Sequence, residues 1–191
     1  MRLAVLVSGS GTLLEAMFAE GLPVELVVTD RDCRGLEIAK GAGVEALCVE
    51  RVAFSEGFDR DSYSAELSSQ LRSRDIGLVA MAGFGTVLSG DMFEHFSGRI
   101  INTHPALLPA FPGWHAVRDA LAYGVKVTGC TIHIATPVVD DGPILAQVAV
   151  PVLDTDDEPT LHERIKVVER QLYTKTIRSI LDRGWITEPG N

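Results

Sequence analysis

The segment Leu3-Ala4-Val5-Leu6-Val7-Ser8-Gly9-Ser10-Gly11-Thr12 decides the fold of this 191-residue chain. Its first five residues are all apolar, which is typical of a strand buried on both faces of a sheet. Two glycines follow immediately, and the sequence from Thr12 onwards favours a helix. A buried strand joined by a glycine turn to a helix is the first half of a β–α–β unit, so the segment predicts a parallel sheet.

The same alternation continues along the chain. Apolar runs predict four further buried strands, over residues 24–28, 44–49, 76–82 and 99–103. Amphipathic stretches between them predict helices over 36–40 and 59–74, the second with Tyr63, Leu67 and Leu71 on one face. Strand–helix alternation of this kind predicts a doubly wound, mostly parallel sheet with right-handed crossovers.

The last third of the chain predicts a different pairing. Residues 131–135 and 144–150 are both β-prone and are joined by a short acidic turn, so they predict an antiparallel pair at the late edge of the sheet. Residues 160–182 predict a long closing helix. Because the chain contains no polar linker, internal repeat or low-complexity segment, we expect one α/β, Rossmann-like domain spanning residues 1–191.

Charge and cysteine usage restrict the functional class. The chain has 26 acidic and 17 basic residues, a net charge of −9, and no run of lysine or arginine, which argues against a nucleic-acid partner. No apolar run approaches the roughly 18 residues of a membrane span. Three scattered cysteines, without CxxC spacing, predict neither a disulfide framework nor a zinc site and favour a cytoplasmic location: Cys33, Cys48 and Cys130.

Asn102 and His104 are the first candidate catalytic residues. They follow a buried strand two residues apart, so on an extended backbone their side chains leave the same face. Each alone is equally consistent with a polar group that satisfies a strand end. Together they offer an amide to stabilise an oxyanion and an imidazole to move a proton. The apolar loop that follows, residues 105–109, must pack either on the protein or on a ligand.

Asp140 is the third candidate, because the turn over 138–143 is expected to reach the same edge of the sheet as His104. A plain hairpin turn is the alternative interpretation. A carboxylate beside an imidazole fixes the ring and stabilises its cation. Asn102, His104 and Asp140 would form a polar set without a serine or cysteine nucleophile. That favours a substrate which brings its own nucleophile, and hence group transfer.

Other motifs leave alternatives open. The glycine loop over 8–12 predicts either a phosphate site at a helix N-terminus or a plain tight turn, and Leu14 departs from the dinucleotide fingerprint. Asp30 is either a ribose-binding acid or, more simply, part of a solvated turn. His133 is expected to be a satisfied core or supporting residue, and His115 either a helix-start residue or a site neighbour. No group of residues has metal-ligand spacing.

Taken in order, these motifs resemble the folate-dependent phosphoribosylglycinamide formyltransferases over nearly the whole chain. The blocks that carry the resemblance are Ser8-Gly9-Ser10-Gly11, Ala82-Gly83-Phe84, Asn102-Thr103-His104-Pro105-Ala106-Leu107-Leu108-Pro109, Phe111-Pro112-Gly113 and Asp140-Asp141-Gly142-Pro143-Ile144-Leu145-Ala146-Gln147. The Asn-x-His-Pro-x-Leu-Leu-Pro and Asp-x-Gly-Pro patterns are specific to folate formyltransferases, whereas the glycine loop is only weakly so.

The resemblance implies that the amine of 5′-phosphoribosylglycinamide (GAR) attacks the formyl carbon of 10-formyltetrahydrofolate, without a metal, in purine biosynthesis. Asn102 would stabilise the oxyanion, His104 would donate a proton and Asp140 would hold His104. The residues implied to bind GAR are Gly11, Thr12, Leu13 and Glu169. Those implied to bind the folate are Arg60, Gly85, Thr86, Val87, Leu88, Asn102, Thr136, Pro137, Val138, Val139 and Asp140. The protein would be a monomer or a homodimer.

Three positions depart from the family pattern. Leu13 stands where an asparagine is frequent, so a phosphate would be held more by backbone N–H groups. Gly85-Thr86 replaces a common methionine–arginine pair, which removes a long cation from the folate pocket. Asp141 replaces a glycine and adds a negative charge near the pterin.

Four other functions are weighed against this one. Methionyl-tRNA formyltransferases share the His-Pro block but resemble a longer chain with an RNA-binding domain. Formyltetrahydrofolate hydrolases share the triad but usually carry an N-terminal regulatory domain, for which the start of this sequence leaves no room. A nicotinamide-dependent oxidoreductase is favoured by the glycine loop and Asp30 and opposed by Leu14. A non-catalytic folate- or nucleotide-binding module predicts that Asn102, His104 and Asp140 are dispensable.

Overall fold

A computed structural model describes residues 1–52 and 57–186 of the chain. They form two compact units, the first from residues 1–52, 57–101 and Ile186, and the second from Asn102–Trp185. The hydrogen-bonded strand order is β3-β2-β1-β4-β5-β6-β7. This order confirms the predicted doubly wound, mostly parallel sheet, whereas the single domain over residues 1–191 stays a prediction.

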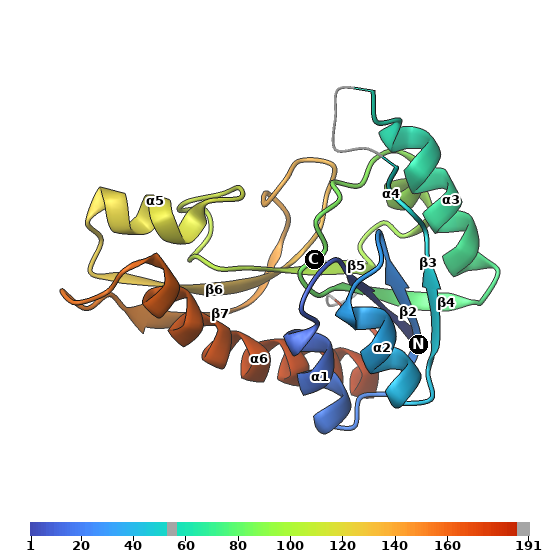
Figure 1. Cartoon of the computed structure of the whole chain (residues 1–191), viewed down its shortest axis with the longest axis horizontal. Helices are drawn as coiled ribbons and strands as arrows, with labels where there is room; N and C mark the ends of the chain where they lie inside the picture. Colours follow the sequence, from blue (N-terminus) through green and yellow to red (C-terminus); the bar gives the residue numbers. More distant parts are fainter. Residues whose placement is uncertain (53–56, 187–191) are drawn as a thin grey trace. The chain divides into compact units, whose positions relative to one another are not determined.

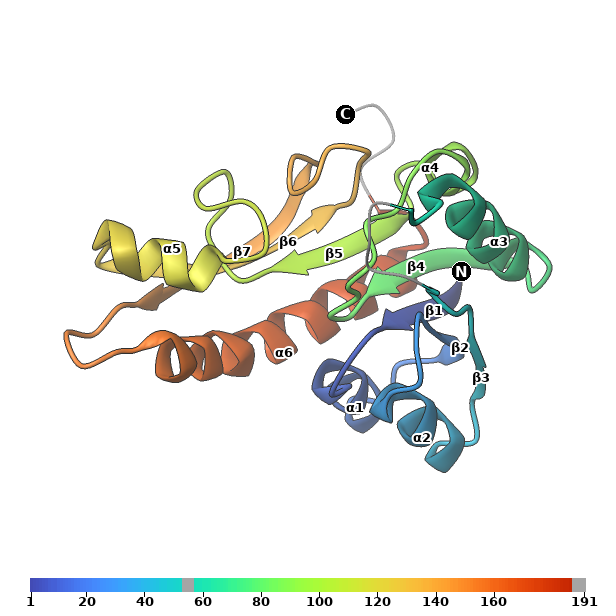
Figure 2. The same ribbon diagram turned by 45° about the horizontal axis from the view of Figure 1, so that its top comes forward.

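The first unit is built from alternating strands and helices (Figure 1). In chain order these are β1 (Arg2–Val7), α1 (Thr12–Ala19), β2 (Val24–Thr29), α2 (Arg34–Gly41), β3 (Glu45–Cys48), α3 (Arg60–Arg72), β4 (Ile76–Met81) and α4 (Asp91–His95). All strand pairs from β3 to β5 are parallel. Figure 2 shows α1 and α2 on one side of β1 and β2, and α3 and α4 on the other, as right-handed crossovers require.

The predicted strands and helices of this unit are confirmed, with ends that differ by at most two residues. β1 is buried from Leu3 to Val7, because helices cover both faces of the sheet. Tyr63, Leu67 and Leu71 are buried on one face of α3, as their spacing predicts. The five-residue helix α4 was not predicted, because so short an element carries no readable periodicity.

The strand order reverses between β1 and β4, and two loops meet at the carboxyl ends of these strands. The Ser8 N–H donates to the carbonyl of Gly83 (3.2 Å), and the Gly85 N–H donates to the Ser8 hydroxyl (2.6 Å). In open α/β sheets, ligands bind at this reversal. The glycine loop and the loop after β4 therefore share one edge, as the sequence predicts.

The second unit begins within β5 (Ile100–His104) and continues through α5 (Ala116–Tyr123), β6 (Val127–Ile134), β7 (Ile144–Pro151) and α6 (Glu158–Arg183). β6 and β7 are antiparallel, which confirms the predicted late-edge pair, and α6 packs along both of them. α5 was not predicted. His115 directly precedes it, which confirms the helix-start interpretation of this residue.

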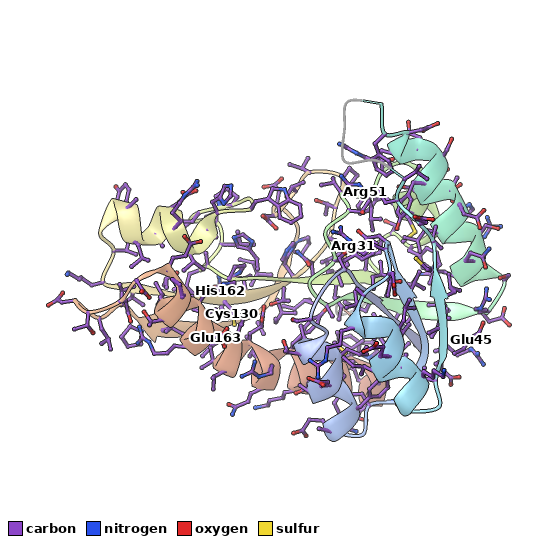
Figure 3. All side chains as sticks on the ribbon, in the orientation of Figure 1. Arg31, Glu45, Arg51, Cys130, His162 and Glu163 are labelled. Carbon is purple, nitrogen blue, oxygen red and sulfur yellow. The ribbon has the colours of Figure 1, made fainter. Side chains whose placement is uncertain are left out.

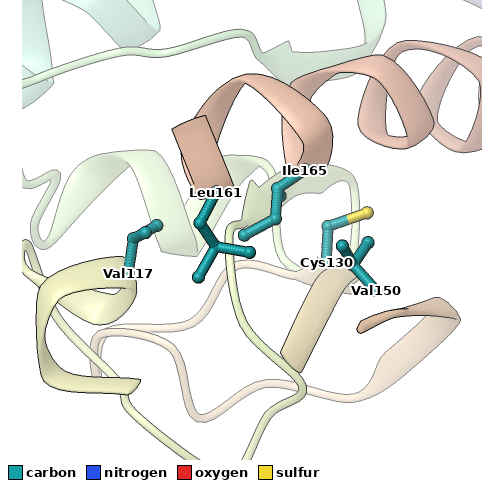
Figure 4. Packing of buried hydrophobic residues seen from close by; sticks show 5 residues of the cluster. All are labelled: Val117, Cys130, Val150, Leu161 and Ile165. Carbon is teal, nitrogen blue, oxygen red and sulfur yellow. The ribbon is translucent and has the colours of Figure 1, made fainter. Parts of the chain in front are cut away.

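The core of the second unit joins α5, β6, β7 and α6. Its buried members, drawn in Figure 4, are Val117, Cys130, Val150, Leu161 and Ile165. The N-terminus of α6 is fixed by a capping box, in which the Asp157 carboxylate accepts from the Thr160 N–H (2.9 Å) and the Thr160 hydroxyl accepts from the Asp157 N–H (2.9 Å). The capping box fixes where α6 begins, and the packing of Leu161 and Ile165 in this core holds the helix against β6 and β7.

The apolar loop after β5 packs on the protein. Its Leu108 N–H donates to the Thr131 hydroxyl (3.0 Å), and that hydroxyl donates to the carbonyl of Ala106 (2.7 Å). The Gln147 amide donates to the carbonyl of Leu108 (2.9 Å). The loop therefore packs on β6 and β7 of the protein, which is the first of the two possibilities that the sequence leaves open.

Candidate active site

β5 presents two of the predicted catalytic side chains on one face. The amide of Asn102 donates to Nε2 of His133 (3.2 Å), and Nδ1 of His104 lies 3.3 Å from Oδ2 of Asp140. His133 Nε2 is also 3.6 Å from Oδ1 of Asp140. The structure thus brings Asn102, His104 and Asp140 together, and His133 lies between the first and the last.

His133 is fixed by its other ring nitrogen. Nδ1 lies 3.0 Å from the carbonyl of Ile134 and, since a carbonyl can only accept, carries a proton. Nε2 is then the atom that faces Asn102 and Asp140. The side chain is 1% exposed, which confirms the expectation of a satisfied, supporting histidine.

Asp140 lies in the loop between β6 and β7, at a left-handed φ of 57°. Its side chain is 6% exposed, and Oδ2 accepts from the Gly113 N–H (2.8 Å). Burial alone raises the pKa of Asp140, but the nearby His133 ring, the hydrogen bond from the Gly113 N–H and the nearby imidazole of His104 lower it below its ordinary value. The carboxylate is therefore ionised at neutral pH.

His104 is held between two acceptors. Its Nε2 donates to the carbonyl of Phe111 (2.7 Å), while Nδ1 faces the Asp140 carboxylate. Both bonds can be made at once only when the ring carries two protons. Phe111 itself has a φ of 54°, a left-handed conformation that costs a non-glycine residue about 1–3 kcal/mol. The turn over residues 111–113 thus contacts both His104 and Asp140.

Thr103 lies between Asn102 and His104 on β5, so its side chain leaves the opposite face of the strand. Glu169 contacts Thr103 on that face, apart from the residues described above. The Thr103 hydroxyl donates to Glu169 on α6 (2.8 Å). Burial raises the pKa of Glu169, in spite of this hydrogen bond and the nearby charges of Lys166 and Arg170. Glu169 is thus a partly buried carboxyl that the rest of the fold leaves only partly compensated.

The glycine loop of the first unit has the geometry of an anion cradle. Gly11 precedes α1 at a φ of 69°, and α1 has no side-chain cap. This left-handed φ favours glycine, and a Cβ on Gly11 would also lie 2.5 Å from Ile38 Cδ1, so the tip of that side chain would have to shift. The Leu13 side chain is buried in the core, which leaves its N–H as the group it can offer at the helix start.

The segment over residues 85–88 borders a buried ion pair. The Thr86 hydroxyl donates to Oδ2 of Asp30 (2.8 Å), and Arg31 Nε donates to Oδ1 of Asp30 (2.9 Å). Asp30 is fully buried, so the solvated-turn interpretation was wrong. Burial opposes its charge, but hydrogen bonds from Arg31, Thr86 and Ser8 hold the pKa of Asp30 below its ordinary value. With these bonds made, Asp30 is a structural acid.

The remaining predicted folate residues are more exposed. Arg60 is the exposed first residue of α3. In the loop after β6 the Thr136 hydroxyl donates to the carbonyl of Val138 (2.9 Å), Pro137 is exposed, and the side chains of Val138 and Val139 are 61% and 49% exposed. Two exposed apolar side chains beside Asp140 are a surface on which a flat aromatic ligand can pack.

The family of the chain follows from a match over most of its length. The model of the family described as formyl transferase matches residues 1–177. This chain belongs to the formyl transferase family.

Relatives of this formyl transferase are closely similar in sequence and structure. It is 46% identical over 188 residues to the phosphoribosylglycinamide formyltransferase of Mycobacterium tuberculosis (strain ATCC 25618 / H37Rv), covering 96% of this chain and 86% of that protein. It is 36% identical over 197 residues to the trifunctional purine biosynthetic protein adenosine-3 of Drosophila melanogaster, covering 98% of this chain and 14% of that protein. The crystal structure of glycinamide ribonucleotide transformylase 1 from Symbiobacterium toebii matches with a TM-score of 0.88 at 42% identity, covering 100% of this chain and 91% of that one.

Several groups of the formyl transferase site were not found by sequence reasoning. The carbonyl of Phe111 and the N–H of Gly113 are backbone groups, which no side-chain pattern reveals. Thr131 and Gln147 are polar residues on strands, and only the folded pairing of β6 with β7 brings them to the loop after β5. Over residues 1–52 and 57–186 no cluster of three metal-ligating side chains is found, and no described helix is long and apolar enough to cross a membrane.

Proposed function

We infer that this chain is a phosphoribosylglycinamide formyltransferase, which transfers the formyl group of 10-formyltetrahydrofolate to the amine of GAR in purine biosynthesis. The relatives described above support the activity and the pathway. The structural observation that supports this activity is a set of contacting side chains, Asn102, His104, His133 and Asp140. It provides an amide, an imidazole and an ionised carboxylate but no side-chain nucleophile, so the attacking atom belongs to the substrate.

In the first step the amine nitrogen of GAR forms a bond to the formyl carbon, and the carbonyl π pair moves onto oxygen. The second N–H of the Asn102 amide stabilises this oxyanion, because the first is given to His133. His133 thereby acts as a positioning residue that fixes the amide plane. Removing one such donor typically lowers a rate by about 10²–10³-fold.

In the second step the electron pair on the oxyanion re-forms the carbonyl, the bond between the formyl carbon and N10 of the folate breaks, and its electron pair goes to N10. His104, doubly protonated beside Asp140, gives N10 a proton, and the attached amine nitrogen loses one, which returns to the His104–Asp140 pair. The products are formyl-GAR and tetrahydrofolate. His104 Nε2 must release the carbonyl of Phe111 before it can donate to a substrate atom.

Substrate binding is assigned by the same proposal. Backbone N–H groups of Gly11, Thr12 and Leu13 hold the phosphate of GAR, supported by the uncapped start of α1. Glu169 binds the remainder of the GAR molecule. The folate is lined by Arg60, Gly85–Leu88, Asn102 and Thr136–Asp140. The enzyme acts as a monomer or homodimer, in the cytoplasm and without a nucleic-acid partner.

The activity is tested by following deformylation of a 10-formylfolate by absorbance, with and without GAR. We expect deformylation that depends on the amine and is abolished by His104→Ala. Deformylation without the amine would instead assign a hydrolase. Full activity of His104→Ala would overturn the roles given to the triad.

Glu169→Gln is expected to separate stability from binding. Folding raises the pKa of Glu169 above the value of 4.5 that it has in the unfolded chain, so the folded state favours the neutral form. This contribution to the free energy of unfolding is fully present below pH 4.5. It is lost as pH rises through the pKa that Glu169 has in the folded state. The uncharged glutamine should therefore raise Tm at neutral pH, by roughly 2–4 °C per kcal/mol, and raise KM for GAR.

The matched control is Glu163→Gln, on the same helix, with a side chain that is 66% exposed and paired with Lys166. It should leave both Tm and KM nearly unchanged. An equal Tm gain in both variants would show that the burial of Glu169 is not the cause, and the Tm gain of Glu169→Gln should disappear when unfolding is measured below about pH 4.5.

A further inference from the structure

Thr103 links the strand that carries the catalytic side chains to the carboxyl on α6 that the proposed function assigns to GAR. Its hydroxyl donates to Oε1 of Glu169 (2.8 Å). Over residues 1–52 and 57–186, this hydroxyl is the only hydrogen-bond donor to that carboxyl, so no protein donor reaches Oε2. Each carboxylate oxygen can accept hydrogen bonds. Oε2 is therefore the oxygen that can accept from a ligand.

The position of Thr103 in β5 gives its hydroxyl a fixed direction. The side chains on either side of it, Asn102 and His104, are each held by the contacts described for the active site. Threonine is branched at Cβ, so its side chain has few rotamers. The Glu169 carboxyl is thereby oriented by the same strand that presents the oxyanion donor and the imidazole.

Thr103 also affects the charge of Glu169. Burial raises the pKa of this carboxyl, whereas the hydrogen bond from Thr103 and the nearby cations of Lys166 and Arg170 on α6 act in the opposite direction. On β6, burial and then the charge of Glu169 raise the pKa of the Cys130 thiol to about 12, so the thiol stays neutral. Figure 3 labels Cys130 on β6, the strand against which α6 packs. The hydroxyl therefore favours the charged form of the carboxyl.

We propose that Thr103 is a positioning residue for GAR, whose hydroxyl fixes one oxygen of the Glu169 carboxylate and leaves the other to accept from a donor of GAR. The proposal rests on the proposed function and identifies what orients the carboxyl that binds GAR. GAR has suitable donors, because it carries ribose hydroxyls and an amide N–H. Since Asn102, Thr103 and His104 are consecutive on β5, one strand places both the bound GAR and the groups that act on the formyl carbon.

The test compares Thr103→Val, which removes the donor and keeps the shape, with Thr103→Ser, which keeps the donor. Thr103→Val is expected to raise KM for GAR by about 5–20-fold in the deformylation assay with the full chain, the effect of one lost hydrogen bond to a charged group. Because Thr103 does not touch the reacting atoms, kcat should stay within about twofold, and Thr103→Ser should have nearly the normal KM. A normal KM in Thr103→Val, or an equal rise in Thr103→Ser, would overturn the proposal.

The pH dependence is a readout that a purely structural role would not change. The proposed contact uses the charged carboxylate, so kcat/KM for GAR falls as pH drops through the pKa of Glu169. Thr103→Val removes a hydrogen bond that lowers this pKa, so the fall should occur at higher pH than in the unmodified chain or in Thr103→Ser. A carbon-13 NMR titration of the Glu169 carboxyl, assigned by its loss in Glu169→Gln, measures the same displacement without turnover. An unmoved midpoint in Thr103→Val would contradict the proposal.

A double variant shows whether Thr103 acts through Glu169. Glu169→Ala removes the carboxyl, so adding Thr103→Val to it should not raise KM for GAR further. The matched control is Thr176→Val on α6, whose hydroxyl donates within the helix to the carbonyl of Leu172 (2.7 Å), and its KM should stay normal. If Thr103→Val raised KM equally with and without the carboxyl, its effect would not pass through Glu169 and the proposal would be wrong.

The two proposals fail in distinguishable ways. If the unmodified chain shows no amine-dependent deformylation, the proposed function is wrong, whatever the titration of Glu169 gives. If that activity is present and Thr103→Val keeps the normal KM for GAR, only the role of Thr103 is wrong.

Discussion

Asp140→Asn is expected to lower kcat/KM for formyl transfer by roughly 10³–10⁴-fold, the size of effect seen when the carboxylate that orients a catalytic histidine is replaced. The asparagine keeps the shape and can still accept from the Gly113 N–H. It loses the charge that stabilises the doubly protonated His104 and the partner that orients both imidazoles. The rate of amine-dependent deformylation measures the loss.

Asp141→Asn is the control for this prediction, because it makes the same change at the neighbouring, exposed position. Its rate should stay within a few-fold of the unmodified enzyme. Near-normal activity in Asp140→Asn, or an equal loss in Asp141→Asn, would contradict the role given to Asp140.

Acid pH gives a second measure of the same group. Folding lowers the pKa of Asp140 below the value of 3.8 that it has in the unfolded chain, so the charged form stabilises the folded state above pH 3.8. This stabilisation is lost as pH falls through the pKa that Asp140 has in the folded state. Asp140→Asn should therefore show a weaker loss of Tm between about pH 5 and pH 2 than the unmodified chain.

Gly142→Ala is expected to destabilise the fold by about 2–4 kcal/mol and to slow the remaining folded enzyme by about 10²-fold. A Cβ at this position would lie 1.7 Å from the carbonyl oxygen of Ile134, which is backbone at the end of β6. The loop must move away to relieve the overlap. Since Asp140 lies two residues earlier in that loop, its carboxylate moves from His104.

Two other glycine variants distinguish a loss of stability from a loss of catalytic turnover. Gly129→Ala places a Cβ 2.0 Å from the carbonyl of Val148 and should destabilise by a similar amount, with normal turnover per folded molecule. Gly41→Ala meets no atom within 4 Å at the end of α2, so it should be neutral or slightly stabilising. Chemical denaturation gives stability, and assays well below Tm give turnover. Normal turnover in Gly142→Ala would contradict the positional role of the loop.

The residues of the candidate site could be predicted where their placement depends only on the neighbouring sequence. Asn102 and His104 share a face because alternate side chains of a strand do so, whatever the strand packs against. The glycine loop predicted the start of α1, because a strand, two glycines and an amphipathic run have few other folded forms. Asp140 required one further step, the expectation that its turn reaches the same edge.

Asp30 shows where this reasoning fails. An Asp-Arg-Asp sequence after a strand has the composition of a solvated turn, yet Asp30 is fully buried. Thr86, 56 residues away, and Ser8 complete its hydrogen bonds. Partners at that separation leave no periodicity in the sequence, so the burial of the acid could not be predicted.

The sequence by itself determined the order of the strands and of helices α1, α2, α3 and α6, the parallel sheet with its antiparallel edge and the candidate catalytic side chains, because these follow from local hydrophobic periodicity and turn chemistry. Only the tertiary structure decided which backbone groups hold His104 and Asp140, that His133 joins Asn102 to Asp140, and that Thr86 bonds Asp30. The physical reason is that these contacts join residues whose separation in the chain is set by the fold as a whole. Backbone donors, acceptors and packing distances carry no mark in the residue types themselves.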